Sequence, residues 1–179
     1  MTKQEIRKHI KVLKLNLSNA ARKAAAQAVF AQVEQMAEFK RAQRILVYNS
    51  LPDELPTGEF IAKHASTKSL FLPRVHGDDL EILAYSPTEL HIGAFHIEEP
   101  TGNDLIDPTT MDLIIVPAVA LDKQGNRLGR GKGYYDRLLR LTSATTIVVG
   151  YDIQLIDEGL PTEPHDIKLT HVITESFKL

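Results

Sequence analysis

The N-terminal part of the chain has apolar side chains at helical spacing. One stripe recurs at intervals of four, three and four residues: Ile6, Ile10, Leu13 and Leu17. This spacing predicts an amphipathic helix. Ser18 then offers an N-cap for a second, alanine-rich helix, which we expect to continue to about Phe39. The chain is therefore expected to open with two helices.

After residue 44 the pattern changes to short, continuous apolar runs, which are typical of strands buried on both faces of a sheet. We expect strands at six of them: residues 45–48, 69–72, 80–84, 113–116, 146–149 and 171–174. Pro73 should close the second strand, helices are expected at 59–64 and 132–141, and residues 86–108 should form a connection. Strands that alternate with helices imply a mainly parallel sheet with helices on its faces. The expected fold is a three-layer α/β/α sandwich that forms a single domain over residues 1–179.

The composition of the chain excludes several kinds of site. Its 179 residues include no cysteine, which excludes a disulfide scaffold, a thiolate nucleophile and a cysteine-ligated zinc or iron–sulfur site. The opening residues are polar and charged, without the apolar segment of a signal peptide, and the longest apolar runs are strand-sized. We therefore expect a soluble, cytoplasmic protein without a membrane partner. We also expect it to be a monomer.

The net charge of −2 hides an uneven distribution. Residues 1–44 carry ten basic and three acidic side chains, whereas the remaining residues carry 11 basic and 20 acidic ones. A basic N-terminal segment can bind nucleic acid. This segment lacks the interleaved aromatic residues of a base-stacking surface, so we favour a solvated helix pair that directs a few cations toward a small phosphate ligand. We expect no nucleic-acid partner.

A glycine-rich loop follows the apolar run at 113–116. Three glycines stand at alternate positions, where they let the backbone approach a ligand and present its N–H groups: Gly129, Gly131 and Gly133. Three cations lie within six residues: Arg127, Arg130 and Lys132. Ligands of open α/β sheets bind outside the carboxyl ends of strands, so this combination favours a polyphosphate. Glycine follows Lys132, so the Walker A pattern is absent, and a flexible cationic surface turn is the alternative.

Asp136 follows this loop, in the first turn of the expected helix. The simpler interpretation is an acid that complements the helix dipole. The functional interpretation is a ligand of Mg²⁺, which prefers one or two carboxylates together with phosphate oxygens. The seven histidines of the chain show no metal-ligand spacing.

One segment resembles the signature of the 5-formyltetrahydrofolate cyclo-ligases, which are also called methenyltetrahydrofolate synthetases: Asn126-Arg-Leu-Gly-Arg-Gly-Lys-Gly-Tyr-Tyr-Asp136. The similarity extends over nearly the whole chain. Further elements follow in the order of the family: the segment from Lys3 to Arg7, residues 48–57, Pro73-Arg74, Ile97-Glu-Glu-Pro100, residues 112–117 and Asp166-Ile-Lys168.

The resemblance implies a fold and a reaction. The family has a three-layer α/β/α fold and converts 5-formyltetrahydrofolate to 5,10-methenyltetrahydrofolate, while ATP becomes ADP and phosphate. ATP is understood to phosphorylate the N5-formyl oxygen, after which N10 attacks the activated carbon and phosphate leaves. The expected co-substrate is therefore ATP, the expected metal is Mg²⁺, and the expected partner is the small-molecule folate.

The resemblance also assigns residues. ATP is expected to contact two segments: Lys3, Gln4, Glu5, Ile6 and Arg7 near the N-terminus, and Arg127, Leu128, Gly129, Arg130, Gly131, Lys132, Gly133, Tyr134 and Tyr135 in the loop. The folate is expected to contact Leu51, Glu54 and Pro56, together with Arg130, Gly131, Lys132, Gly133 and Tyr134. Catalysis is assigned to Lys132, Arg130 and Tyr134, and Mg²⁺ to Asp136 and Asp166. Such a set of cations and a metal suits phosphoryl transfer, which needs positioning and charge neutralisation.

The chain departs from the family pattern after its first strand. The family commonly has Glu-x-Asp/Glu-Thr there, with an acid that contacts the pterin, whereas this chain has Glu54-Leu-Pro56-Thr57. Proline offers no side-chain acceptor to the pterin N–H groups. We therefore expect folate binding to depend on Glu54 and on backbone carbonyls near Leu51.

Two other functions fit the same pattern. Folds of this type are shared with sugar-phosphate isomerases and CoA-transferases, so the fold alone does not decide the reaction. A non-catalytic regulator that retains the ATP loop is the second alternative, and Pro56 is the feature that favours it. The loop signature favours the cyclo-ligase.

Overall fold

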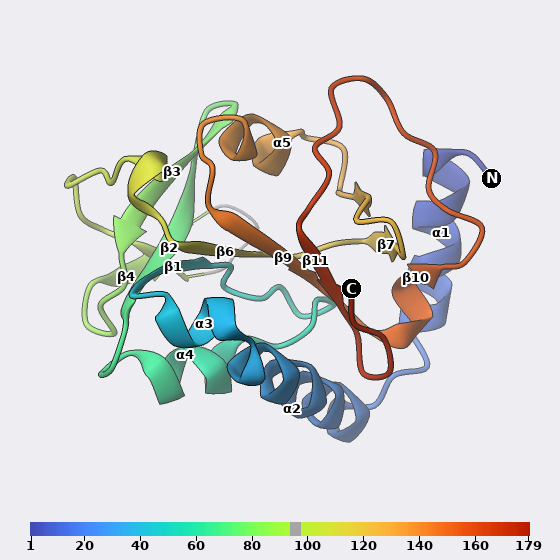
Figure 1. The fold of residues 1–179 in the computed structure, drawn as a ribbon, viewed down its shortest axis with the longest axis horizontal. Coiled ribbons are helices and arrows are strands. Elements are labelled where there is room, and N and C mark those ends of the chain that lie inside the picture. The colour runs from blue at the N-terminus through green and yellow to red at the C-terminus, as the bar shows by residue number, and fades with distance from the viewer. Residues whose placement is uncertain (94–97) are drawn as a thin grey trace.

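A six-stranded sheet organises the computed structural model, which describes residues 1–93 and 98–179 (Figure 1). Its strands are β1 Arg44–Val47, β2 Ser69–His76, β3 Asp79–Ala84, β6 Leu113–Val116, β9 Thr145–Val149 and β11 His171–Ile173. They lie in the order β11, β9, β6, β1, β2, β3. All neighbouring pairs are parallel except β2 and β3, which form an antiparallel hairpin. The most apolar strand, β6, is buried along its whole length and lies next to β1 in the middle of the sheet.

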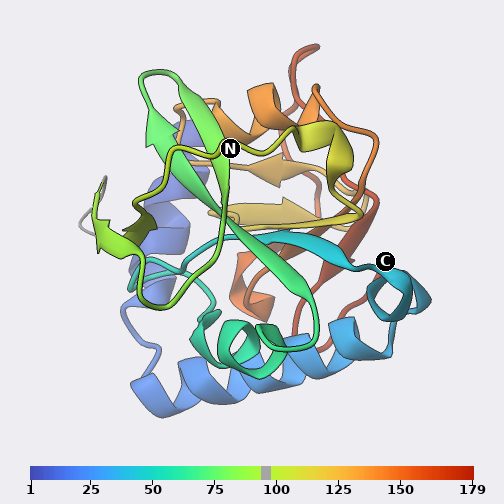
Figure 2. The ribbon, with the colours of Figure 1, turned by 90° about the vertical axis from the view of Figure 1, so that its left-hand side faces the viewer.

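Helices cover both faces of this sheet. One face carries α2 Asn19–Gln35, α3 Ala37–Arg41 and α4 Gly58–His64, and the other carries α5 Tyr134–Leu139. Figure 2 shows the layers edge-on, with α2 and α4 below the sheet and α5, in orange, above it. The expected α/β fold, with a mainly parallel sheet between helices, is confirmed. In residues 1–93 and 98–179, no helix has both the length and the hydropathy of a transmembrane span.

The first helix, α1 Lys3–Lys14, lies beside a second, smaller sheet (Figure 1). This sheet contains β7 Ala120–Asp122, β8 Arg127–Leu128 and β10 Leu155–Ile156, the last of which follows the single-turn helix η3 Asp152–Gln154. Ile6 and Ile10, from the expected apolar stripe, are buried together with one apolar residue from each of these strands. The opposite side of α1 is thereby free to carry charged residues.

Two expected boundaries are wrong for physical reasons. The second helix does not run unbroken to Phe39, because Met36 has an extended backbone (φ −67°, ψ 138°) that separates α2 from α3. The side chains of Met36 and Phe39 are both buried in the core. β2 does not end at Pro73 but continues to His76. The pairing of β2 with β1 ends at Phe71. Pro73 lies beyond that pairing, so no hydrogen bond to β1 is lost because proline has no N–H group.

The stretch from 86 to 108 is more ordered than the expected connection. It contains β4 Leu90–Ile92 and β5 Glu98–Pro100, which form an antiparallel pair, and the single-turn helix η2 Pro108–Thr110 follows it. Arg74 in β2 donates to the carbonyls of Pro100 and Gly102, at 3.1 and 2.7 Å, and so holds this stretch against the main sheet. Ile97, part of a family element named above, lies outside the described residues.

Asp112 joins the N-terminal ends of the central strands. Its carboxylate accepts hydrogen bonds from the backbone N–H groups of Arg44 and Gln43, both at 2.9 Å. Its own N–H donates to the Arg44 carbonyl, and its carbonyl accepts from Thr145. The bonds from Arg44 and Gln43 hold the pKa of the Asp112 carboxyl below its ordinary value.

We predict that Asp112→Ala lowers the free energy of unfolding by about 1 kcal/mol at neutral pH, since two backbone donors lose a charged acceptor but remain near solvent. The folded pKa lies below the ordinary value of 3.8, so the contribution of Asp112 is complete above that pH and is lost as the pH falls through the folded pKa. Urea denaturation of both proteins, at neutral pH and in strong acid, measures this difference. If the two proteins differ in free energy of unfolding by the same amount at neutral pH and in strong acid, the charged form of Asp112 is not what stabilises the fold.

Candidate functional site

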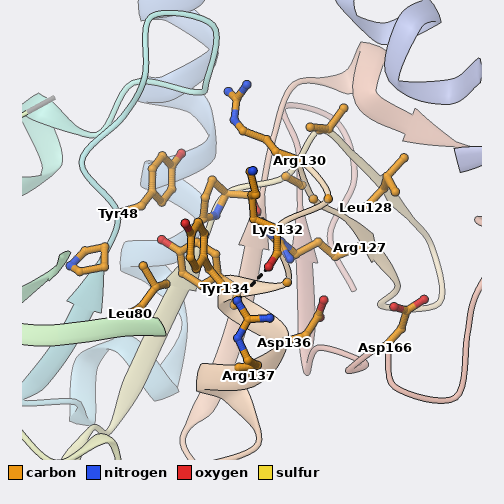
Figure 3. A pocket seen from close by; sticks show the side chains of 18 of the residues that line it. Tyr48, Leu80, Arg127, Leu128, Arg130, Lys132, Tyr134, Asp136, Arg137 and Asp166 are labelled. Atoms are coloured by element: carbon orange, nitrogen blue, oxygen red, sulfur yellow. Dashed lines mark hydrogen bonds between the residues drawn. The ribbon is translucent and has the colours of Figure 1, made fainter. Parts of the chain in front are cut away.

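A cavity of about 450 Å³ opens at the carboxyl ends of β1 and β6 (Figure 3). The residues that follow these two strands line it, together with the β2–β3 hairpin, the N-terminal half of α1, and the segment from β8 into α5. A stretch near the C-terminus, residues 163–166, closes one side. Open α/β sheets bind ligands at this edge, so the position agrees with the one expected from the sequence.

The glycine-rich loop lies between β8 and α5, and every residue from 127 to 137 lines the cavity. Gly131 and Gly133 have φ angles of +102° and +70°, which residues with side chains adopt only at a cost. Because Gly133 is the N-cap of α5 in this conformation, the helix begins at Tyr134 and not at Lys132 as expected. This turn brings Asp136, in the first turn of α5, to the cavity wall.

Arg127 and Tyr135 fix the base of the loop. The guanidinium of Arg127 lies 5.0 Å from the centre of the Tyr135 ring, and its Nε donates to the Pro117 carbonyl at 2.6 Å. Burial lowers the pKa of Arg127 and raises the pKa of Tyr135. Both side chains line the cavity and are held in place by these contacts.

Two cations of α1 reach the cavity from the other side. Thr2 caps the helix through a reciprocal bond with Glu5, which fixes where the first turn begins. Arg7 donates from Nε to the Gly129 carbonyl at 2.9 Å. Lys3 lies one turn earlier on the same face and also lines the cavity.

Lys3 contacts an acidic cluster near the C-terminus. Its Nζ lies 2.8 Å from Glu163 and 2.9 Å from Asp166, and the ligand atoms of Glu163, His165 and Asp166 all lie within 4.8 Å of one another. Burial alone would lower the pKa of Lys3, but its hydrogen bonds to the two acids outweigh that effect and raise it. Asp166 was expected from the resemblance, whereas Glu163 and His165 were not. The only signal was their closeness to Asp166 in the chain.

A network of charges surrounds Arg130. One of its nitrogens lies 2.6 Å from Asp53 and 3.5 Å from Glu54, and the buried Lys14 lies 3.7 Å from Asp53. Burial raises the pKa of Glu54, although the Leu51 N–H and Arg130 act against that rise. Glu54 and Leu51 both line the cavity, so the structure brings them beside Arg130. Lys14 and Asp53 were not recognised from the sequence.

Four of the residues assigned through the resemblance do not line this cavity. Gln4 is exposed, Glu5 caps α1, and Ile6 is buried with the small sheet. Pro56 lines a second cavity, of about 520 Å³, between α2 and α4. The buried Leu55 separates Pro56 in the chain from Glu54, which lines the first cavity, and a folate contact by Pro56 stays a prediction.

The model of the 5-formyltetrahydrofolate cyclo-ligase family matches residues 1–175 of this chain. The chain belongs to this family. A 5-formyltetrahydrofolate cyclo-ligase of Haemophilus influenzae is 33% identical over 181 residues, which cover 96% of each protein. Another, from Mycolicibacterium smegmatis, is 45% identical over 94 residues, 50% of this chain and 48% of that one. The relatives are named as ligases.

A solved structure agrees with this assignment. The NMR structure of Aquifex aeolicus 5,10-methenyltetrahydrofolate synthetase is 34% identical and matches with a TM-score of 0.90. The match covers 99% of this chain and 92% of that one. The cyclo-ligase resemblance of the loop therefore extends to the whole fold.

Asp122 supports the loop in this cyclo-ligase family member. The carboxylate is fully buried at the turn between β7 and β8. It accepts four hydrogen bonds, each of 2.9 Å, from the N–H groups of Gln124, Asn126 and Leu160 and from the Asn126 side chain. It thereby ties the base of the loop to the segment that leads to residues 163–166.

We predict that Asp122→Asn lowers the free energy of unfolding by about 3 kcal/mol, because the new amide group faces buried donors and cannot accept from them. Asp157→Asn is the matched control. Asp157 is 73% exposed and pairs with Lys123 at the surface, so its replacement should change stability by less than about 0.5 kcal/mol. Chemical denaturation of the three proteins measures both effects. Similar midpoints for the two variants would be evidence against the supporting role of Asp122.

Proposed function

We propose that this protein converts 5-formyltetrahydrofolate to 5,10-methenyltetrahydrofolate with ATP and Mg²⁺, and releases ADP and phosphate. One observation carries the proposal: a single cavity has two different walls. One wall is the cationic, glycine-rich loop, and the other contains apolar residues and a buried carboxyl group. The loop suits a polyphosphate, and the wall suits a flat, partly apolar ring with N–H groups. Lys132 lies in the loop, between the two parts.

The phosphate part of the site would use the loop and α1. Arg7 and Arg127 place their guanidinium groups close to the loop and donate to the carbonyl oxygens of Gly129 and Pro117. A carbonyl fixes a guanidinium without cancelling its charge, so these groups can still attract phosphate oxygens. Lys3 would join them by exchanging an acidic partner for a phosphate. The residues from Leu128 to Tyr135 would complete the ATP site through their backbone.

The folate part would lie between the loop and the opposite wall. Tyr48, Leu51, Leu80 and Tyr134 border it, and two buried carboxyl groups, those of Glu54 and Glu99, line the same cavity. Burial raises the pKa of Glu54, and its carboxyl oxygens can accept hydrogen bonds from the pterin N–H groups. Arg130 and Lys132, together with Gly131 and Gly133, would face both substrates.

The residues near the C-terminus fit the Mg²⁺ that the family implies. Carboxylate oxygens of Glu163 and Asp166 pair with the ammonium of Lys3, at 2.8 and 2.9 Å, and this gathering of negative charge supports the assignment. Asp136 lines the same cavity from α5. Oxygen donors of this kind are those that Mg²⁺ prefers, beside phosphate oxygens. We propose that Asp136 and Asp166 hold the ion, which would neutralise part of the phosphate charge when bound.

In the proposed reaction, the γ-phosphoryl group of ATP passes to the N5-formyl oxygen and ADP leaves. N10 then forms a bond to the formyl carbon and loses its proton, the carbon–oxygen bond breaks, and phosphate leaves. Lys132 and Arg130 would stabilise the charge on the moving phosphoryl group, and Tyr134 would hold the folate in line with it. Catalysis by such groups depends on positioning and electrostatics.

An absorbance assay for methenyltetrahydrofolate, with purified protein, MgATP and 5-formyltetrahydrofolate, tests the proposal. Product formation that depends on both substrates is the expected result. ATP binding without turnover would instead favour the regulator, and the absence of both would refute the proposed site.

We predict that Lys132→Ala lowers kcat by about 10²–10³, the scale for loss of one electrostatic stabiliser, with a smaller change in ATP affinity. Other cations and the loop amides would continue to bind ATP. Lys132→Arg should not restore kcat fully, since a planar fork does not replace a compact charge. Steady-state kinetics and direct ATP binding measure the two effects. If kcat is unchanged and only ATP binding weakens, Lys132 is a docking residue.

We also predict that turnover requires Mg²⁺ and that Asp136→Ala and Asp166→Ala each raise the Mg²⁺ concentration for half-maximal rate by about tenfold or more, because each removes a carboxylate ligand. Asp104→Ala, in an exposed loop, is the control. Titration of the rate with Mg²⁺ gives the midpoints. Full activity in excess chelator would refute this prediction.

A further inference from the structure

Three guanidinium groups lie against the three alternate glycines of the loop, one on each. A Cβ atom added to Gly129 would lie 2.9 Å from Arg127, one added to Gly131 would lie 3.6 Å from Arg7, and one added to Gly133 would lie 2.7 Å from Arg137. At Gly129 and Gly133 the absence of a side chain therefore allows the arginine to approach the backbone, whereas a Cβ at Gly131 would make an ordinary contact with Arg7. The first two arginines are part of the proposed ATP site, whereas Arg137 has no role in it so far.

Arg137 is bonded differently from the other two. One of its terminal nitrogens donates to the Lys132 carbonyl at 2.8 Å and also to the Asp78 carbonyl, and its Nε donates to the Asp78 carbonyl at 2.8 Å. A peptide group points its N–H away from its carbonyl. A fixed Lys132 carbonyl therefore also fixes the direction of the Gly133 N–H, and with it the backbone from which the Lys132 side chain extends.

The second acceptor belongs to the opposite wall of the cavity. Asp78 lies at the tip of the β2–β3 hairpin, and Val75 and Leu80, on either side of that tip, line the cavity. The Tyr134 hydroxyl donates weakly to the neighbouring Gly77 carbonyl, at 3.4 Å. Figure 3 shows Arg137 below Tyr134, with Leu80 on the hairpin side. The guanidinium thus bridges the end of the loop and the hairpin tip.

We propose that Arg137 is a positioning residue that sets the distance between the glycine-rich loop and the β2–β3 hairpin. The kinetic part of this inference rests on the proposed function, because it assumes that the phosphoryl donor lies against the loop and the acceptor against the hairpin. A fixed separation between them would align the two substrates, and alignment contributes to the rate more than to binding.

Two variants separate positioning from direct phosphate contact. Arg137→Lys keeps the charge but loses the planar fork that serves two carbonyls at once, whereas Arg137→Ala loses both. Arg41→Ala is the control, because Arg41 is exposed in α3 on the opposite face of the sheet.

Hydrogen exchange without any ligand tests the bridge itself. In both Arg137 variants, amides in the segments 74–80 and 130–137 should exchange about tenfold faster, the scale for loss of a hydrogen bond from a charged donor. Exchange elsewhere, and exchange in Arg41→Ala, should match the original protein. Unchanged exchange in either segment would overturn the proposal, whatever the reaction.

Kinetics test the consequence for catalysis. Both Arg137 variants should lose about tenfold or more in kcat, with the KM for ATP changed by less than about threefold, because alignment is lost and phosphate contacts remain. Free guanidinium ions should partly restore Arg137→Ala but not Arg137→Lys.

If Arg137→Lys is fully active while Arg137→Ala binds ATP poorly, Arg137 contacts phosphate directly and the proposal is wrong. If the original protein has no activity, the proposed function fails, and hydrogen exchange alone decides whether Arg137 forms the bridge.

Discussion

Positive charge is more easily concentrated around a short loop when neighbouring cations have fixed acceptors, and the arrangement of this site depends on the acceptors of its arginines. Like charges a few ångströms apart repel one another. The protein uses two kinds of acceptor. Arg7 is bonded to the Gly129 carbonyl, which leaves its charge available, while Arg130 is bonded to Asp53, whose negative charge offsets it. The first kind suits permanent attraction of an anion, and the second suits a residue that changes partners.

Much of the fold could be predicted because its signals are local. Continuous apolar runs identify the central strands, since a strand covered on both faces has no polar side to show. The errors occur where a distant segment decides the outcome. Pro73 is compatible with β2 only because β1 is short, and the pairing of residues 90–92 with 98–100 is held in place by Arg74 from another strand. Neither fact is visible in the local sequence.

The residues of the candidate site also differ in whether the local sequence reveals them. The loop could be recognised because its glycines and cations are contiguous, so chain spacing and spatial spacing coincide. Glu163 could not, because its partner Lys3 lies 160 residues away in the chain, and His165 contacts Glu163 and Asp166 in turn. Pro56 is a further example, because the resemblance places it with Glu54 whereas in the structure the two residues line different cavities.

The packing of α1 has a consequence for the thermodynamics of binding. This helix supplies Lys3 and Arg7, yet its apolar contact is small and centres on Ile6 and Ile10. Small packed elements open more easily than the central strands of a domain. The apparent affinity for any ligand that needs both cations is reduced by the fraction of molecules in which α1 is detached. By linkage, the same ligand holds the helix in place, so that occupancy of the cavity and docking of α1 are coupled equilibria.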